Sequence, residues 1–152
     1  MNYEELLDLT VDLAFQLQNC GAETYRVEEA VVRLLEAYGV QGAAFSIPGC
    51  IIVSLETAEE QHITRMHRAA DSSTDLDGME RYSGLCRRIC REKPPVQEAM
   101  AMLQAEKQAT KTYRFPTLLM AYFLSAAGFS VFFRGTMLDA LCAGCLLYTS
   151  DA

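Results

Sequence analysis

Apolar residues recur at helical spacing in two runs within the first 40 positions. The first run extends from Leu6 to Leu17, with Asn2 before it as the start of an approximate capping box. The second run begins at Thr24 and keeps the same period. The runs stop at Gly21 and Gly39, residues typical of helix ends. The pattern predicts two amphipathic helices joined as a hairpin.

The pattern then changes to that of strands. Two runs, VQGAAFSI and CIIVSLET, lie on either side of Pro48 and Gly49, and this dipeptide suits a tight turn. In the second run, side chains alternate between two faces, with Ile51, Val53 and Leu55 on the same one. The run HITRMHR at residues 62–68 is a candidate third strand. We expect a small antiparallel sheet.

Two further helices complete the predicted domain. Thr74 and Asp77 form a capping pattern before an apolar run that ends at Pro94, because proline cannot continue a helix. A further helix starts at about Val96. This order of elements predicts an α+β fold for residues 1–112: a helical hairpin, a small antiparallel sheet and two helices.

Residues 115–133, FPTLLMAYFLSAAGFSVFF, carry no charged side chain. As a helix they would extend roughly 28 Å, close to the ~30 Å hydrocarbon core of a bilayer. A buried core helix is the alternative, but a small domain has little protein with which to cover a helix that is apolar on every side. We therefore expect residues 113–144 to form the start of a transmembrane domain. The first span would be a helix at 115–133, and a second span would begin near 138.

The charges flanking this segment predict its orientation. Lys107, Lys111 and Arg114 precede it, whereas Arg134 follows it closely. The positive-inside rule then places the amino-terminal domain in the cytoplasm. The first residues show no basic region followed by an apolar stretch, so we expect no cleaved signal peptide.

Composition excludes some partners and cofactors. The formal net charge of −7 disfavours nucleic-acid binding. Cytoplasmic thiols stay reduced, so buried free thiols are the default for Cys20, Cys50, Cys86 and Cys90. A zinc site built from Cys86, Cys90, Cys142 and Cys145 is the alternative, which is disfavoured because the two pairs lie on opposite sides of the apolar segment. We expect neither a metal nor a cofactor.

The last eight residues, CLLYTSDA, resemble the translation of a transposase adapter used in DNA library preparation. We therefore expect residues 145–152 to be non-native and the chain to be the front fragment of a longer membrane protein. Sequencing the uninterrupted gene beyond Gly144 would test this expectation, which requires further apolar segments to follow.

The stretch GAETYRVE at residues 21–28 opens the second predicted helix. Glu23 and Glu28 suit the positive end of the helix dipole. Arg26 lies in the same first turn, where its charge is unfavourable unless it has a carboxylate partner or an anionic ligand.

This helix start resembles the amino-terminal domain of the threonine/serine exporter family, whose members show a similar GAE..RVE motif. The resemblance extends over roughly residues 2–144 and includes ITRMHR (63–68), STDLDGMERYSGLCRRI (73–89) and RGTMLDALCAG (134–144). One departure is Thr136 after Gly135, where the family passage often carries two glycines.

The resemblance implies a secondary transporter that exports threonine, serine or similar small metabolites across the cytoplasmic membrane, with small carboxylic acids as an alternative substrate. The implied partners are the lipid bilayer, a second membrane subunit supplying the remaining spans, and other copies of the chain. No GxxxxGK[ST] loop occurs, which argues against an ATP-driven pump.

The candidate residues for a cytoplasmic substrate-binding site or gate are Glu23, Arg26, Glu28 and Arg65. Ion pairing among these residues is the alternative. Asp139 is the candidate for proton coupling, because acidic residues in membrane segments often serve as proton relays. Its alternative is a loop acid at the membrane interface.

Two other functional classes remain open. A membrane-anchored hydrolase would need a nucleophile and a base, but His62 and His67 are five residues apart on a predicted strand and face opposite sides. Neither GxSxG nor HExxH occurs. An assembly domain that positions the membrane part is the third reading.

Overall fold

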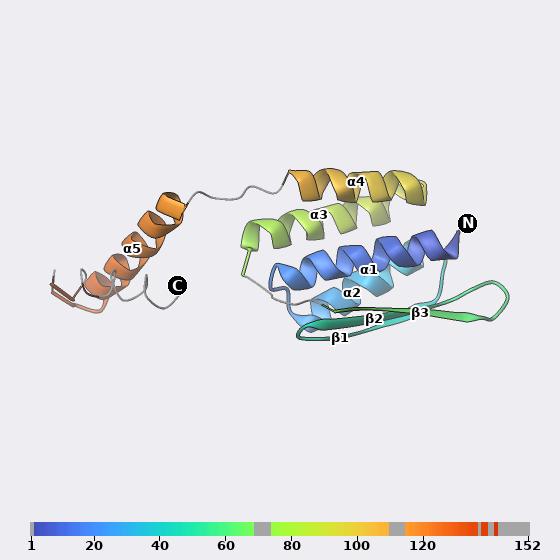
Figure 1. The fold of residues 1–152 in the computed structure, drawn as a ribbon, viewed down its shortest axis with the longest axis horizontal. Helices are drawn as coiled ribbons and strands as arrows, with labels where there is room; N and C mark the ends of the chain where they lie inside the picture. Colours follow the sequence, from blue (N-terminus) through green and yellow to red (C-terminus); the bar gives the residue numbers. More distant parts are fainter. Residues whose placement is uncertain (1, 69–73, 110–114, 137, 140–141, 143–152) are drawn as a thin grey trace. The chain divides into compact units, whose positions relative to one another are not determined.

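The structure is a computed structural model that describes residues 2–68, 74–109, 115–136, 138–139 and 142 (Figure 1). The chain divides into two compact units, Met1–Thr110 and Lys111–Ala152. The predicted domain boundary near residue 112 and the predicted adapter tail lie outside the described residues.

The helical hairpin predicted at the amino terminus is present. Helix α1 spans Tyr3–Asn19 and helix α2 spans Thr24–Ala37. The side chain of Asn2 accepts a hydrogen bond from the backbone N–H of Glu4 at 3.1 Å, which satisfies one of the free donors at the helix start. Gly39 follows α2 with φ at +72°, a left-handed conformation that glycine adopts at little cost.

Three antiparallel strands form a sheet in the order β1-β2-β3: β1 Gly42–Ile47, β2 Cys50–Glu56 and β3 His62–Arg68. Ile47 pairs with Cys50, so Pro48 and Gly49 form a two-residue turn. Gly49 has φ at +84°, which explains the glycine at this position. Both the hairpin and the third strand are confirmed.

The two faces of the sheet have different environments. Ile51, Val53 and Leu55 are fully buried against the helices, as the alternation predicts. On the opposite face, Phe45 and Met66 flank Ile52 in the strand register, and their side chains are 58% and 60% exposed. The sheet therefore contributes one face to the core and leaves an apolar patch on the other.

Helices α3, Leu76–Glu92, and α4, Val96–Gln108, follow the sheet. The predicted cap at Thr74 is wrong, because the helix begins one residue later than that cap requires. Asp75 is the N-cap, and its carboxylate accepts a hydrogen bond from the N–H of Gly78 at 3.0 Å. Lys93, with φ at +47°, ends α3 directly before the two prolines.

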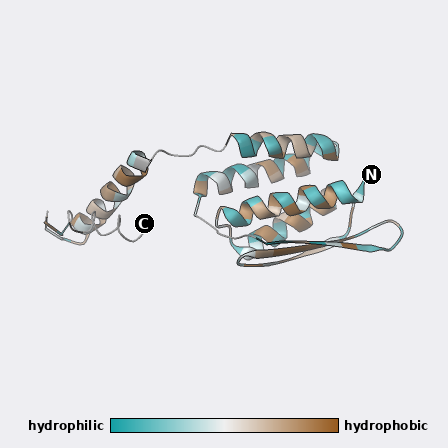
Figure 2. Ribbon diagram, viewed as in Figure 1, coloured by the Kyte–Doolittle hydropathy of each residue, from teal (hydrophilic) through white to brown (hydrophobic). Residues whose placement is uncertain are grey.

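The first unit has three layers (Figure 1). The sheet packs against α1 and α2, and α3 and α4 pack on the other side of these two helices. Every helix of this unit has an apolar stripe and a polar stripe (Figure 2), and the apolar stripes meet in one core. The α+β class predicted for this domain is confirmed.

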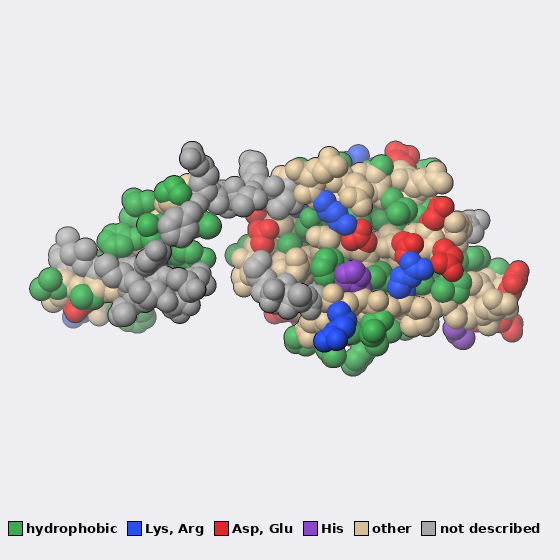
Figure 3. Space-filling view, in the orientation of Figure 1, with side chains coloured by type: hydrophobic (Ala, Val, Ile, Leu, Met, Phe, Trp, Pro, Cys, Tyr) green, Lys and Arg blue, Asp and Glu red, His purple; other side chains and the backbone are tan. Residues whose placement is uncertain are grey.

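Helix α5, Phe115–Phe132, belongs to the second unit. It is predominantly hydrophobic along its length (Figure 2), and hydrophobic side chains gather on its surface (Figure 3). Among the described residues, no helix combines the length and the apolar character needed to cross a membrane. The predicted transmembrane helix is therefore not confirmed.

Two glycines of α3 provide a matched test of the packing. A Cβ at Gly78 would lie 2.7 Å from the sulfur of Cys20 and 2.5 Å from the capping carboxylate of Asp75, whereas a Cβ at Gly84 would meet only the end of the Arg87 side chain, at 3.9 Å. We expect Gly78→Ala to destabilise the protein by about 1–2 kcal/mol and Gly84→Ala to stabilise it by about 0.5–1 kcal/mol. Urea unfolding of the full chain, followed by circular dichroism, measures both. Equal effects of the two substitutions would contradict this packing.

Candidate functional site

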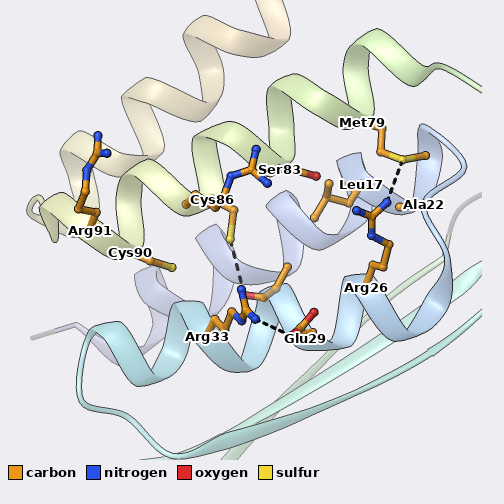
Figure 4. Close-up of a pocket in the computed structure, with 12 residues that line it drawn as sticks. Leu17, Ala22, Arg26, Glu29, Arg33, Met79, Ser83, Cys86, Cys90 and Arg91 are labelled. Atoms are coloured by element: carbon orange, nitrogen blue, oxygen red, sulfur yellow. Dashed lines mark hydrogen bonds and ion pairs between the residues drawn. The ribbon is translucent and has the colours of Figure 1, made fainter.

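A groove of about 440 Å³ lies between α2 and α3 (Figure 4). We call it the α2–α3 groove. Its wall is formed by residues from these two helices and from the α1–α2 joint: Leu17, Ala22, Arg26, Glu29, Ala30, Arg33, Met79, Ser83, Cys86, Arg87, Cys90 and Arg91. A volume of this size is typical of sites for small molecules.

Helical periodicity brings these side chains to one place. On α2, Glu29, Ala30 and Arg33 lie three, four and seven positions after Arg26 and therefore share a face with it. The neighbouring face of α2, with Val27, packs into the core. On α3 the same spacing relates Met79, Ser83, Cys86 and Cys90.

The groove is rich in arginine. Arg26, Arg33, Arg87 and Arg91 line it, and Glu29 is its one acidic residue, so the lining carries 4 − 1, or +3, formal charges. The chain as a whole carries −7. The α2–α3 groove is therefore a basic site on an acidic protein.

The arginines differ in their partners (Figure 4). Arg33 pairs with Glu29 at 2.6 Å, and Arg91 lies 3.5 Å from Glu92. Arg26 points across the groove and donates to the sulfur of Met79 at 3.9 Å, a weak contact that leaves its charge unneutralised. Arg87 forms no ion pair with any described residue.

Two thiols lie on the α3 side of the groove. The thiol of Cys86 points toward α2 and contacts the carbonyl oxygen of Ala30 at 3.7 Å. A hydrogen bond from this thiol lowers the pKa of Cys90 to about 7, and the positive charge of Arg33 acts in the same direction. The same hydrogen bond and burial raise the pKa of Cys86. Because Cys86 has a single proton, Ala30 and Cys90 compete for it.

The structure places only one of the predicted cytoplasmic site residues in this groove, Arg26. Glu23 is the N-cap residue of α2, and its hydrogen bond with the hydroxyl of Tyr25 is the main reason why the pKa of that tyrosine is raised. Glu28 faces the sheet, where its carboxylate accepts the N–H of Ser46 at 2.8 Å.

Arg65 lies on β3 and pairs with two carboxylates of α1, Glu4 at 2.9 Å and Asp8. In the described part of the chain, no ion pair joins any two of Glu23, Arg26, Glu28 and Arg65. These residues therefore occupy separate places, and the mutual pairing considered as their alternative role does not occur.

The comparison with known proteins adds an independent observation. The sequence profile of a family described as "Putative threonine/serine exporter" matches residues 8–148, which is most of the chain. This chain belongs to the threonine/serine exporter family. The resemblance seen in the GAETYRVE motif is thereby confirmed, and the family is one of transporters rather than enzymes.

An uncharacterized protein of Schizosaccharomyces pombe is 27% identical to this exporter-family chain over 132 residues. The match covers 84% of the chain and 17% of the yeast protein, so the chain spans about a sixth of the length of this relative. No solved structure matches the chain.

In the family passage after α5, Asp139 takes part in a hydrogen-bonded cap. Its carboxylate accepts both the N–H and the hydroxyl of Thr136, each at 2.8 Å, and its own N–H donates to that hydroxyl at 3.3 Å. This reciprocal pattern is a capping box, which the sequence Thr136-x-x-Asp139 could have revealed. This cap gives Asp139 a structural role, in addition to the proton-coupling role expected from the sequence.

The thiol pair generates a prediction about pH. The thiolate is the reactive form, so alkylation of Cys90 should rise with pH through a midpoint of about 7 and then level off. Burial raises the pKa of Cys20, which should therefore react only at more alkaline pH. Mass-spectrometric mapping after iodoacetamide labelling of the full chain measures both rates.

Cys86→Ala serves as the control, because it removes the hydrogen-bond donor and should move the midpoint of Cys90 upward. A midpoint for Cys90 near that of an ordinary thiol, unchanged by Cys86→Ala, would contradict the described thiol pair.

Proposed function

We propose that this chain forms part of a secondary transporter that exports threonine, serine or similar small metabolites across the cytoplasmic membrane. The observation that carries the proposal is the family match over residues 8–148. Small carboxylic acids are the alternative substrate class. The chain spans 17% of the length of its yeast relative. In this proposal, a complete protein or assembly supplies further membrane segments and carries the transport activity.

The proposal assigns residues 115–133 to the membrane. Its support is chemical: this segment contains no charged side chain, and α5 exposes large apolar residues on several sides, among them Leu124 at 64% and Phe132 at 79%. Water does not favour an apolar helix surface of this kind, whereas lipid or neighbouring membrane helices would cover it. A second membrane subunit or a longer chain would provide those neighbours.

The first unit would then be the cytoplasmic domain. Three basic residues before the apolar segment, Lys107, Lys111 and Arg114, support this orientation. Lys107 also forms a close ion pair with Asp12 of α1, so it fixes α4 to the domain as well as marking the cytoplasmic side.

Of the four candidate residues in this domain, we assign the role of a gating contact to Arg26 first. Arg65 is engaged with Glu4 and Asp8, and Glu28 is engaged with Ser46, so both contribute to packing β3 and β1 against the helices. Among the residues that the structure describes, the thioether of Met79 is the hydrogen-bond partner of Arg26, which faces an open groove.

A second candidate function is assembly, in which the domain holds copies of the protein together. The outward face of the sheet favours it, because Phe45, Met66 and Ile47 expose apolar side chains there. Homo-oligomer formation is compatible with export. A hydrolase has no comparable support, since His62 and His67 fall on opposite faces of β3, as predicted.

Export can be measured in cells that express the complete protein and take up a threonine-containing dipeptide. We expect intracellular threonine to accumulate to a lower level, and extracellular threonine to rise faster, than in cells without the protein. Parallel feeding with serine peptides and small carboxylic acids defines the substrate class. If none of these compounds leaves the cells faster, the proposed function is wrong.

Asp139→Asn tests proton coupling in the same assay. Asparagine keeps an oxygen that can accept the two hydrogen bonds of Thr136, so the cap should survive, but it cannot carry a proton. If Asp139 couples protons to transport, Asp139→Asn should abolish export and its pH dependence. Full export by this variant, together with loss in Asp139→Ala, would identify Asp139 as a cap alone.

A further inference from the structure

We propose that the α2–α3 groove binds a small anion that carries at least two negatively charged groups, phosphates or carboxylates, and that this ligand acts on the cytoplasmic domain rather than being the transported amino acid. The proposal goes beyond the proposed function, because it assigns a second ligand to the protein.

The first argument is charge. Four guanidinium groups line the groove and one of its residues is acidic, so the lining carries three more positive than negative charges. Glu29 is already held by Arg33 at 2.6 Å. Guanidinium groups bind phosphate and carboxylate oxygens through paired N–H donors, which makes this lining suited to such anions.

The second argument is the absence of internal partners. Among the described arginines of the first unit, Arg26, Arg68 and Arg87 form no ion pair, and two of these three arginines line the groove. The chain contains 20 acidic residues against 13 basic ones, so carboxylates are abundant. Leaving Arg26 and Arg87 without them, beside one groove, is accounted for by an anionic ligand.

The third argument is size and shape. A groove of about 440 Å³ is much larger than a single phosphate ion requires, and arginines of both helices line it. Arg26 and Arg33 come from α2, whereas Arg87 and Arg91 come from α3. A ligand with two separated anionic groups can bind both helices at once and hold them together.

The same observations argue against a zwitterionic amino acid in this groove. Its ammonium group would need an available carboxylate, and the one carboxylate of the lining is paired with Arg33. Near Arg26 and Arg87, which form no ion pair with any described residue, an ammonium group would be repelled. A ligand of net negative charge is the better chemical match.

The test uses the full chain purified in detergent and isothermal titration with four probes: pyrophosphate, glutarate, threonine and chloride. We expect pyrophosphate or glutarate to bind, and added salt to weaken this binding. Threonine and chloride should show no comparable binding. The stronger of the two binding probes tells whether phosphate or carboxylate is the recognised group.

Arg26→Gln and Arg87→Gln should each weaken the binding by about tenfold or more, because each removes charge-assisted hydrogen bonds. Arg68→Gln is the matched control. It removes an arginine that likewise forms no ion pair within the described part of the chain. Arg68 lies on the outward face of the sheet, opposite Cys50 in the register, so its substitution should leave the affinity unchanged. Circular dichroism verifies that each variant is folded, and Arg26→Lys replaces Arg26→Gln if the latter is not.

A second readout reports on the groove itself. Because Cys90 lines the groove, a bound anion should slow its alkylation several-fold, whereas alkylation of Cys50 on the sheet should be unaffected. Lack of binding by both pyrophosphate and glutarate, equal weakening by Arg68→Gln, or threonine binding as tight as either anion would each overturn the proposal. None of these results depends on an export assay, so failure of this proposal is distinguishable from failure of the proposed function.

Discussion

The arrangement of the first unit depends on the burial of α1 between two layers. Its apolar residues face both the sheet and the α3–α4 layer, and the helix buries nine of its residues, including Thr10 and Gln18. Thr10 satisfies its hydroxyl by donating to the carbonyl of Leu6 at 2.7 Å. The acidic residues of α1 reach sideways to both layers, Asp8 to Arg65 of β3 and Asp12 to Lys107 of α4. These ion pairs connect α1 to a strand of one layer and to a helix of the other.

Because α1 occupies the centre, α2 has a different role. It packs Val27, Val31, Leu34 and Leu35 inward and leaves its arginine-bearing face at the edge of the domain, next to α3. The α2–α3 groove therefore lies at the edge of the hydrophobic core, and its positive charge comes from the arginines of α2 and α3 that line it.

The elements of this fold could be predicted because each has a local signal: helical spacing, alternation, proline and glycine. The helix cap of α3 was missed since Thr74 and Asp75 are both good caps, and only the position of the first turn selects Asp75. The groove could not be predicted for a different reason. Arg33 and Cys90 are 57 positions apart in the sequence, and no local pattern states that α2 and α3 are neighbours. The family motifs suggested that Glu23, Arg26, Glu28 and Arg65 form one site. In the folded domain these four residues lie in separate places.

The GAETYRVE motif nevertheless has a structural explanation that connects it to the groove. The α1–α2 joint packs directly on the start of α3: the carbonyl of Cys20 accepts the N–H of Asp75 at 3.1 Å, and Gly78 leaves room for the sulfur of Cys20. This contact brings the first turn of α2 beside the first turn of α3, so that Arg26 faces Met79. An arginine in that turn is unfavourable to the helix dipole of α2. Its position at one end of a basic groove, without a carboxylate partner among the described residues, is where an anion would offset that cost.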